Sequence, residues 1–421
     1  CMLTPKRIRK VISRVICVFL PGITLKRLLA NTVHAVWMIA FSLLWLSHVN
    51  MYDGFDFMNE VMDYKELLSK HILNKKPELL PTEKYLLLNT SKNNEILPAD
   101  NDNTLNTVIT DREALLKSLQ LLDSNSDKIS LVICDVFFES PSSNRLADSL
   151  LGAVVQHLDA KNKLILPALY YDDDASLQLP LFSCRTGVSQ YRSSFLNEQF
   201  LKYSFMLDDT LKQLPLIAYE NITGHRMEKK RRLCFPYYTM NGKWCLNTII
   251  PEIRYAADAL EEDVSYHHIG TFSREMLKDN QIVVIGDFEG KYDVHSTIAD
   301  NISGALILIN ALEALMNGDN IIGPRYLLML FVFFFFVGYY TFFNKDLEHQ
   351  NQKFINKSPF FRFLVVQSNY LLLLLLVLIS MLYFHHYIHF LILMSYFMVI
   401  DIVLYLINQC RSKKQKVKKS C

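Results

Sequence analysis

The chain has 421 residues, of which 51% are hydrophobic, and its formal net charge is +2 at pH 7. With a charge so nearly balanced, we expect no nucleic-acid partner. The sequence contains none of the patterns G-x-x-x-x-G-K-[ST], G-x-G-x-x-G, G-x-S-x-G and H-E-x-x-H. Their absence excludes the common signatures of P-loop, dinucleotide-binding, α/β-hydrolase and zinc-protease chemistry. We therefore expect a protein that is not an enzyme and that uses no cofactor.

The first 27 residues carry seven Lys or Arg side chains and no acid. Cations beside a first span hold that end of the chain in the cytoplasm, so we predict that residues 1–27 form a basic cytoplasmic N-terminus. A cleaved signal peptide is the alternative, but Arg14 interrupts the apolar stretch 11–20, and no small-residue cleavage site follows. Residues 28–52 contain no charged group, and we predict a transmembrane helix over 28–49.

Residues 50–324 are enough for a sizeable hydrophobic core, and short apolar runs alternate there with helical patterns. The predicted strands cover residues 84–88, 129–134, 163–167, 214–219 and 281–286. The predicted helices cover residues 111–122, 145–158 and 303–316. Asp111 and Ser303 are candidate helix caps, and Asn317-Gly318 is a stop signal. Strands separated by helices of this length predict an α/β domain with a mostly parallel sheet.

Polar stretches of this domain carry further predictions. Asn241-Gly242 lies between two β-prone runs within residues 233–250, which predicts an antiparallel hairpin that pairs Cys245 with Tyr238. Residues 89–106 are predicted to form a surface loop, and residues 53–81 a charged helical linker. Residues 228–232 are predicted to form a solvated turn, with an anion-facing patch as the alternative.

Cysteines give little information about this domain. Four of the eight lie in it, and an oxidising compartment would permit disulfides between them. Cys134 lies inside an apolar predicted strand, where a small buried thiol is expected. No Cys or His spacing indicates a zinc site.

Five polar residues follow the ends of two predicted strands. Asp135 and Asp287 each come directly after an apolar run, and Asp293, His295 and Thr297 follow Asp287. Ligands of open α/β sheets bind at the carboxyl edge of the strands, so we predict a ligand site at these five residues. Taken by themselves, these residues favour structural anchoring of backbone amides first, a ligand site second, and metal binding or acid/base catalysis least. Acids there favour a cationic, hydroxyl-rich or metal-bridged ligand over a bare anion.

The last hundred residues are strongly apolar. Residues 326–343 carry no charge, and residues 363–400 form a run of 38 without Asp, Glu, Lys or Arg. A spanning helix needs about 20 apolar residues, so this run is long enough for two. We predict spans over residues 325–343, 363–384 and 387–408, with a tight turn in the histidine-rich segment between the last two. Asp401 lies in the last span and is a functional candidate of undetermined role.

Cations also flank the later spans. Residues 409–421 hold six Lys or Arg and no acid, and four more cations lie between the second and third predicted spans. Short segments rich in cations stay on the cytoplasmic side. We therefore expect a multi-pass protein of the cytoplasmic (inner) membrane, with a basic cytoplasmic tail at 409–421, both termini in the cytoplasm, and residues 50–324 outside.

Two stretches of the domain carry a family resemblance. ITDREALLKSLQLL followed by ISLVICDVFFES, and QIVVIGDFEGKYDVHSTIADNISGALILINALEALMNGDNII, are similar to blocks of bacterial receptors with a CHASE type-2 sensor domain. The order of the spans is also similar. The positions that carry the second block are Gly286, Asp293, Thr297, Gly304, Asn310 and Ala311.

The resemblance covers residues 84–323 and implies an extracytoplasmic sensor. Two departures stand out: the family's acidic motif after the first strand is not clear in LLLNTSKNNEIL, and no kinase or cyclase output domain follows the spans. We expect a receptor or accessory subunit that binds an unknown extracytoplasmic ligand and signals through a protein partner. A structural or assembly component of an envelope complex is the alternative, and an envelope enzyme is the least supported.

Overall fold

The computed structural model describes residues 24–44, 78–98, 106–171, 176–190, 200, 202–208, 210–232, 235–256, 260–262, 264–289, 293–297, 301–350, 367–386 and 388–420. The chain forms two compact units. One comprises residues 1–50, 231–237 and 322–421, and the other comprises residues 51–230 and 238–321. The predicted basic N-terminus, most of the predicted linker 53–81, and Cys234 lie outside the described residues.

The α/β unit is built on a seven-stranded sheet, so the predicted class is confirmed. Five strands run parallel in the order β13-β1-β14-β4-β5. Their bounds are Tyr266–His268 (β13), Tyr85–Asn89 (β1), Gln281–Gly286 (β14), Ile129–Cys134 (β4) and Leu164–Tyr171 (β5). Two short strands extend the sheet beside β5, namely β7 (Thr186–Val188, parallel) and β6 (Ser176–Gln178, antiparallel).

The centre of the sheet is the pair β4 and β14. These strands are hydrogen-bonded neighbours, with Ile133 opposite Val284 and Cys134 opposite Ile285. All six residues of β14 are buried. The near-continuous Val and Ile content predicted strands covered on both faces, and that prediction is confirmed.

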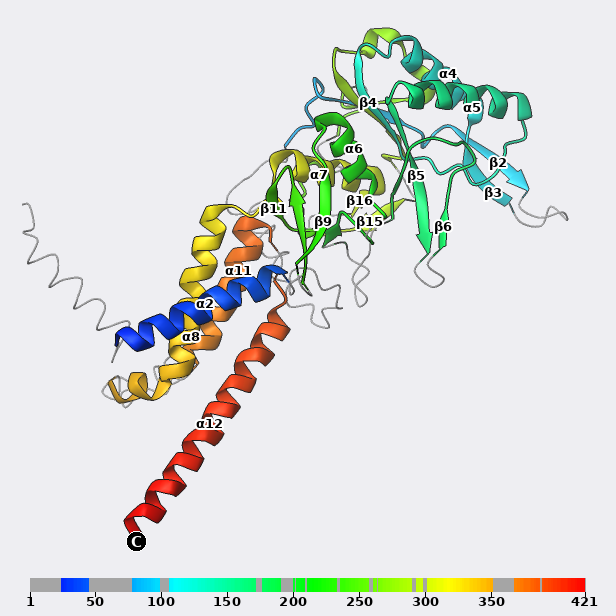
Figure 1. Cartoon of the computed structure of the whole chain (residues 1–421). Helices are drawn as coiled ribbons and strands as arrows, with labels where there is room; N and C mark the ends of the chain where they lie inside the picture. The colour runs from blue at the N-terminus through cyan, green and yellow to red at the C-terminus, as the bar shows by residue number, and fades with distance from the viewer. Residues whose placement is uncertain are drawn as a thin grey trace, which may run out of the picture. The chain divides into compact units, whose positions relative to one another are not determined.

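Four helices cover the two faces of this sheet (Figure 1). Helices α4 (Arg112–Ser124) and α5 (Arg145–Ala160) pack together on one face, against a core that includes Val283 and Ile285. Helices α6 (Leu214–Thr223) and α7 (Gly304–Asn317) contact each other on the other face, with α6 against β4 and β5 and α7 against β14. Because side chains alternate along a strand, Ile282 and Val284 serve this second face.

The predicted helix caps are confirmed. The Asp111 carboxylate accepts hydrogen bonds from the backbone N–H groups of Glu113 and Ala114 at the start of α4. The Ser303 hydroxyl accepts from Leu306 at the start of α7, and Gly318 ends that helix with a left-handed φ of 73°. These side chains satisfy backbone donors that the first turn of a helix leaves free.

The strand predicted over residues 214–219 is wrong, because these residues form helix α6. Pro215 lies in its first turn, where its fixed φ suits a helix, and Gly224 ends it with a left-handed φ of 71°. Five of the ten residues of α6 are buried, and all five lie within residues 214–219, so the apolar residues form a continuous run without helical periodicity. A short, continuous apolar run does not distinguish a strand from a buried helix.

Two polar segments predicted without regular structure contain strands. The predicted loop 89–106 includes β2 (Asn94–Pro98), which pairs antiparallel with β3 (Asn106–Thr110). The predicted turn 228–232 lies within β9 (Met227–Arg232), an outer strand of a three-stranded sheet. Apart from the buried Met227, the described residues of β2, β3 and β9 are exposed or half-buried, so their polar sequences give only a weak strand signal.

The predicted hairpin is confirmed in the same small sheet. Strands β10 (Phe235–Met240) and β11 (Lys243–Cys245) are antiparallel, and Tyr238 pairs with Cys245 as expected. Asn241 and Gly242 turn the chain with left-handed φ angles of 48° and 74°. The remaining short elements are β8 (Tyr203–Ser204) paired with β12 (Thr248–Ile249), β15 (Val294–Ser296) paired with β16 (Asn301–Ser303), and the 3-10 turns η3 (Ile269–Thr271) and η4 (Arg274–Met276).

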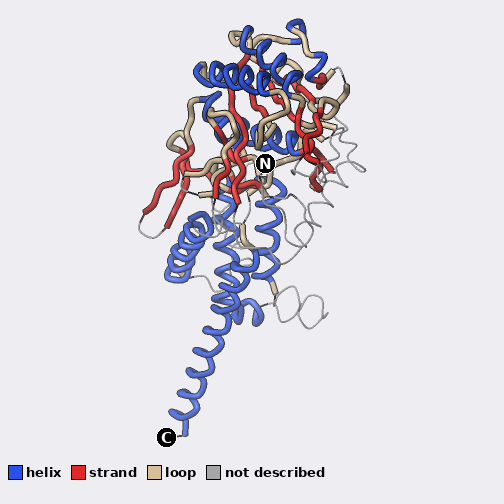
Figure 2. Tube along the Cα trace, turned by 90° about the vertical axis from the view of Figure 1, so that its right-hand side faces the viewer, coloured by secondary structure: helices blue, strands red, loops and turns tan. Residues whose placement is uncertain are grey.

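The second unit consists of apolar helices α2 (Leu25–Leu44), α8 (Pro324–Gln350), α11 (Ser368–Phe384) and α12 (Phe390–Ser420). Three of their segments are long and apolar enough to span a membrane: Leu25–Leu44, Pro324–Phe342 and Phe390–Ile407. Helix α11 is strongly apolar but has 17 residues, so the described structure supports three of the four predicted spans. The turn predicted after α11 is present, with His385 in a left-handed conformation. Helix α12 continues unbroken beyond its apolar part (Figure 2).

Small and polar residues hold the apolar helices together. A Cβ at Gly338 of α8 would lie 2.8 Å from both Asn31 Oδ1 and His34 Nδ1 of α2, so only glycine allows this approach. Asp401 of α12 accepts a hydrogen bond of 2.7 Å from the Tyr370 hydroxyl of α11. The acid predicted in the last span therefore has an interhelical partner.

Candidate functional site

The connections after β4 and β14 create a crevice at the carboxyl edge of the sheet. The chain leaves β4 toward α5 on one face and leaves β14 toward α7 on the other face. Adjacent parallel strands whose connections diverge in this way leave an opening between the two loops, and ligands of open α/β sheets bind there. The predicted site residues lie in these two connections.

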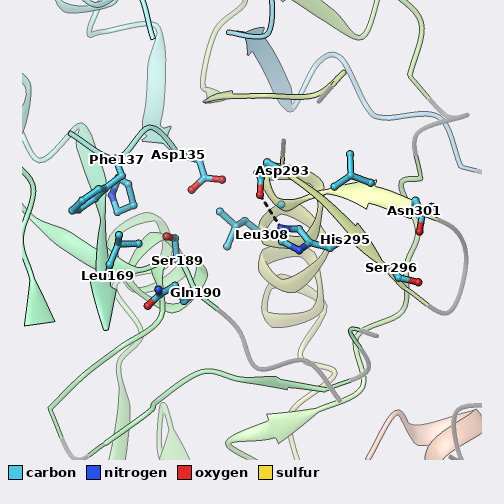
Figure 3. Close-up of a pocket in the computed structure, with 13 residues that line it drawn as sticks. Asp135, Phe137, Leu169, Ser189, Gln190, Asp293, His295, Ser296, Asn301 and Leu308 are labelled. Atoms are coloured by element: carbon cyan, nitrogen blue, oxygen red, sulfur yellow. Dashed lines mark hydrogen bonds and ion pairs between the residues drawn. The ribbon is translucent and has the colours of Figure 1, made fainter. Parts of the chain in front are cut away.

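An open pocket of about 800 Å³ occupies this crevice. Small-molecule sites typically measure about 300–1,000 Å³. In Figure 3, Asp135 and Phe137 approach from one side and Asp293 and His295 from the other, with Leu308 between them. The described lining residues are Asp135, Phe137, Pro167, Leu169, Ser189, Gln190, Asp293, Val294, His295, Ser296, Asn301, Gly304 and Leu308.

Asp135 is placed by the end of β4. Its backbone N–H donates a 2.7 Å hydrogen bond to the carbonyl of Ile285, which extends the ladder by one residue. A Cβ at Gly286 would lie 3.0 Å from the Cβ of Ala305 and 3.5 Å from that of Asp135, so glycine allows close packing of strand, acid and helix. Burial, with a smaller contribution from the charge of Asp293, raises the pKa of Asp135 to about 7.

Asp293 and His295 are positioned by the hairpin of β15 and β16. Their side chains form a 2.8 Å contact between Asp293 Oδ1 and His295 Nε2. The Asp293 carbonyl accepts the N–H of Gly304, the first residue of α7, and its carboxylate Oδ2 lies 2.5 Å from where a Gly304 Cβ would be. A carboxylate at a helix N-terminus interacts favourably with the helix dipole. Asp293 is thus held by its own hairpin and by α7.

Asp287 and Thr297, the other two predicted site residues, do not line the pocket. Asp287 has a buried Oδ1 without a hydrogen-bond partner among the described residues, and its pKa is raised by burial and then by Asp293. Thr297 is buried and pairs with Phe200 in a parallel β-bridge. The structure therefore brings together three of the five predicted residues, with Asp287 as an electrostatic neighbour and Thr297 as a structural residue.

Several residues that line the pocket were not predicted from the sequence. Phe137 follows Asp135 by two positions, and the strand-end signal that identified Asp135 could have included it. Ser189 and Gln190 follow β7, a strand of three residues that is too short to show periodicity. Asn301 belongs to β16, also of three residues. No local sequence signal marks those short strands.

A second polar cluster lies at the same edge of the sheet, beyond β1. Glu262, His268 and Glu289 offer ligand atoms within 4.8 Å of one another, which is close enough for a metal ion. The Lys92 ammonium lies 3.2 Å from Glu262 and 3.6 Å from Glu289. Its pKa is raised, chiefly by the hydrogen bond to Glu262. The two carboxylates therefore already have a cation from the chain itself.

Comparison of the chain with protein-family models, with curated proteins and with solved structures gives no match. The description of the site therefore rests on its geometry: two carboxylates and an imidazole around an open pocket at the carboxyl edge of a parallel sheet.

Proposed function

We propose that this chain is a multi-pass protein of the cytoplasmic membrane whose α/β domain lies outside the cytoplasm and binds a small ligand. It acts as a receptor or accessory subunit that passes its bound state to a protein partner. The observation that carries this proposal is the pocket between Asp135 and the Asp293–His295 pair, at the place where α/β sheets bind ligands.

The membrane part of the proposal rests on apolar length and on charge. Three helices meet the requirement for a span, and α11 would serve as the fourth because its 17 residues carry no charge and continue an uncharged run. The basic segments at both ends would stay in the cytoplasm. An even number of spans then leaves the α/β domain outside, as the resemblance to CHASE type-2 receptors implies.

The acids of the pocket are held in defined positions by their neighbours. Asp293 is already bonded to His295 and held against α7, an arrangement that positions a carboxylate rather than leaving it mobile. The spans and the basic segments are the parts of the chain that would reach a partner in the membrane or the cytoplasm.

The test is to purify the full chain in detergent and to identify the small molecules that it releases on denaturation by mass spectrometry. The double variant Asp293→Ala/His295→Ala should lose the bound molecule while its thermal midpoint stays nearly unchanged. The matched control is Asp123→Ala/His157→Ala, which removes another Asp–His pair, with a 2.6 Å contact, outside the pocket. Loss of several degrees in the first double variant, with no molecule released from the wild type, would show that Asp293 and His295 only anchor a loop.

A structural role in an envelope complex is the second candidate, and the β2–β3 hairpin favours it. Ile96 and Val108 face each other across this hairpin, and they are 68% and 51% exposed. Paired apolar side chains on an exposed hairpin are suited to contact with another protein. Replacing both with Ser should disrupt co-purification of a fixed partner if this role holds, and should leave it intact if the partner binds elsewhere.

A further inference from the structure

We propose that the pocket binds an organic cation, with an ammonium group between the carboxylates of Asp135 and Asp293 and an apolar portion against Phe137 and Leu308. This inference rests on the proposed ligand-binding function and assigns its ligand class.

The charge of the lining is the first argument. Its described residues include two carboxylates and no Lys or Arg, and Asp287 adds a third acid close by. At the neighbouring cluster of Glu262 and Glu289, by contrast, Lys92 supplies a cation. A partly buried carboxylate that faces another carboxylate is unfavourable until a positive charge joins it. Among the described lining residues only the His295 imidazole can carry a positive charge, and it already contacts Asp293, so a cationic ligand is what would pair with Asp135.

The spacing of the groups argues for a molecule larger than a metal ion. Among the described residues, the only three potential metal ligands whose atoms approach within 4.8 Å of one another are Glu262, His268 and Glu289. Asp135, Asp293 and His295 do not meet that limit, so as placed they do not form a ready-made three-ligand metal site. Figure 3 shows the side chains of Asp135 and Asp293 on opposite sides of an opening, and we place the ammonium group of the ligand between them.

The remaining lining suits an organic body. Phe137, Leu169 and Leu308 contribute apolar surface around the acids, and Ser189 and Gln190 add neutral polar groups farther along the same side. An aromatic ring near a cation site contributes a further attraction when the cation lies over its face. A bare inorganic cation would use none of this surface.

The experiment compares three probes with one apolar body: 2-phenylethylammonium, 2-phenylethanol and phenylacetate. Each is titrated into the full chain in detergent by isothermal calorimetry at pH 8. The ammonium should bind, and the alcohol and the carboxylate should bind at least tenfold more weakly. Asp135→Asn should weaken ammonium binding at least tenfold, whereas Asp123→Asn, which removes an acid outside the pocket, should leave it unchanged. Below pH 7 the ammonium affinity should fall by up to tenfold per pH unit, because Asp135 takes up one proton.

The outcomes separate the ligand class from the function. Binding of the alcohol or the carboxylate that equals or exceeds that of the ammonium would overturn the assignment and leave ligand binding intact. Absence of ammonium binding at millimolar concentration would overturn it as well. The proposed ligand-binding function fails together with the ligand assignment only if the purified chain also releases no small molecule.

Discussion

Replacing Asp135 with Asn should stabilise the α/β domain at pH 8 and stabilise it by only about a third as much at pH 5. Asparagine keeps the shape of the side chain and removes its charge. Burial and Asp293 raise the pKa of Asp135 from 3.8 to about 7. A carboxyl group whose pKa is higher in the folded chain than in the unfolded chain opposes folding once it is ionised. This cost is absent below pH 4, grows as the pH rises from 4 to 7, and is complete above pH 7.

The size of the effect follows from the same pKa. At about 1.4 kcal/mol per pKa unit, the change from 3.8 to about 7 corresponds to roughly 4 kcal/mol in the free energy of unfolding. The Asp135 side chain retains some contact with solvent in the open pocket, so we expect about 1–2 kcal/mol. For a domain of this size that is a rise of roughly 2–8 °C in the thermal midpoint.

The assay is thermal unfolding of the full chain in detergent, followed by near-ultraviolet circular dichroism at pH 5, 6, 7 and 8. Asp123→Asn is the control, because its expected effect on the thermal midpoint has the opposite sign. Burial alone would raise the pKa of Asp123, but hydrogen bonds from Lys161 and His157 lower it overall. Its ionised form therefore stabilises the fold above pH 4, and the variant should melt lower than the wild type at pH 8. An Asp135→Asn midpoint equal to or below that of the wild type at pH 8 would refute the electrostatic account of the pocket.

Three further predictions concern the core, the pocket and the topology. Ile285→Asp should unfold the α/β domain, because an unpaired buried carboxylate lowers the free energy of unfolding by more than about 4 kcal/mol. Ile285→Val should lower it by only about 1 kcal/mol, and limited proteolysis distinguishes the two variants. Gly304→Ala should displace the Asp293 carboxylate and weaken ligand binding in calorimetry, whereas Gly323→Ala, where a Cβ meets nothing within 4 Å, should not. A reporter fused after Cys421 should report cytoplasm and one inserted near residue 100 the outside, and the reverse result at either position would contradict the proposed orientation.

The parts of the fold that could be predicted from sequence are those with strong local signals. The buried strands β4 and β14 were recognisable by their continuous Val and Ile content, and helix α4 by the Asp111 cap with leucines at helical spacing. The Asn241-Gly242 turn fixed a hairpin register correctly. In each case the secondary structure that the local sequence prefers is also the one that the tertiary structure contains.

The elements and site residues that were predicted wrongly or missed lack such a local signal. The first six residues of helix α6 form a continuous apolar run, so packing rather than a helical period in the sequence decides its conformation. Asp135 and Asp293 could be predicted because acids after buried strands point to the carboxyl edge. Ser189 could not be, because it reaches the pocket only through the pairing of the short strand β7 with β5. Contacts that depend on sheet register leave no trace in the adjacent sequence.

The position of α7 suggests how an occupied pocket could be sensed beyond the domain. Asp293 contacts the first residue of this helix, which is buried along nearly its whole length and ends at Asn317. Helix α8, which contains the second apolar segment, begins at Pro324, so only residues 318–323 join the two helices. A ligand that pulls on the Asp293 carboxylate acts on the N-terminus of a rigid, densely packed helix, and such a helix moves as a unit more readily than it bends. Helix α7 is therefore the shortest covalent route from the pocket to an apolar helix of the second unit. Under the proposed receptor role, a change at Asp293 would reach that helix along this route.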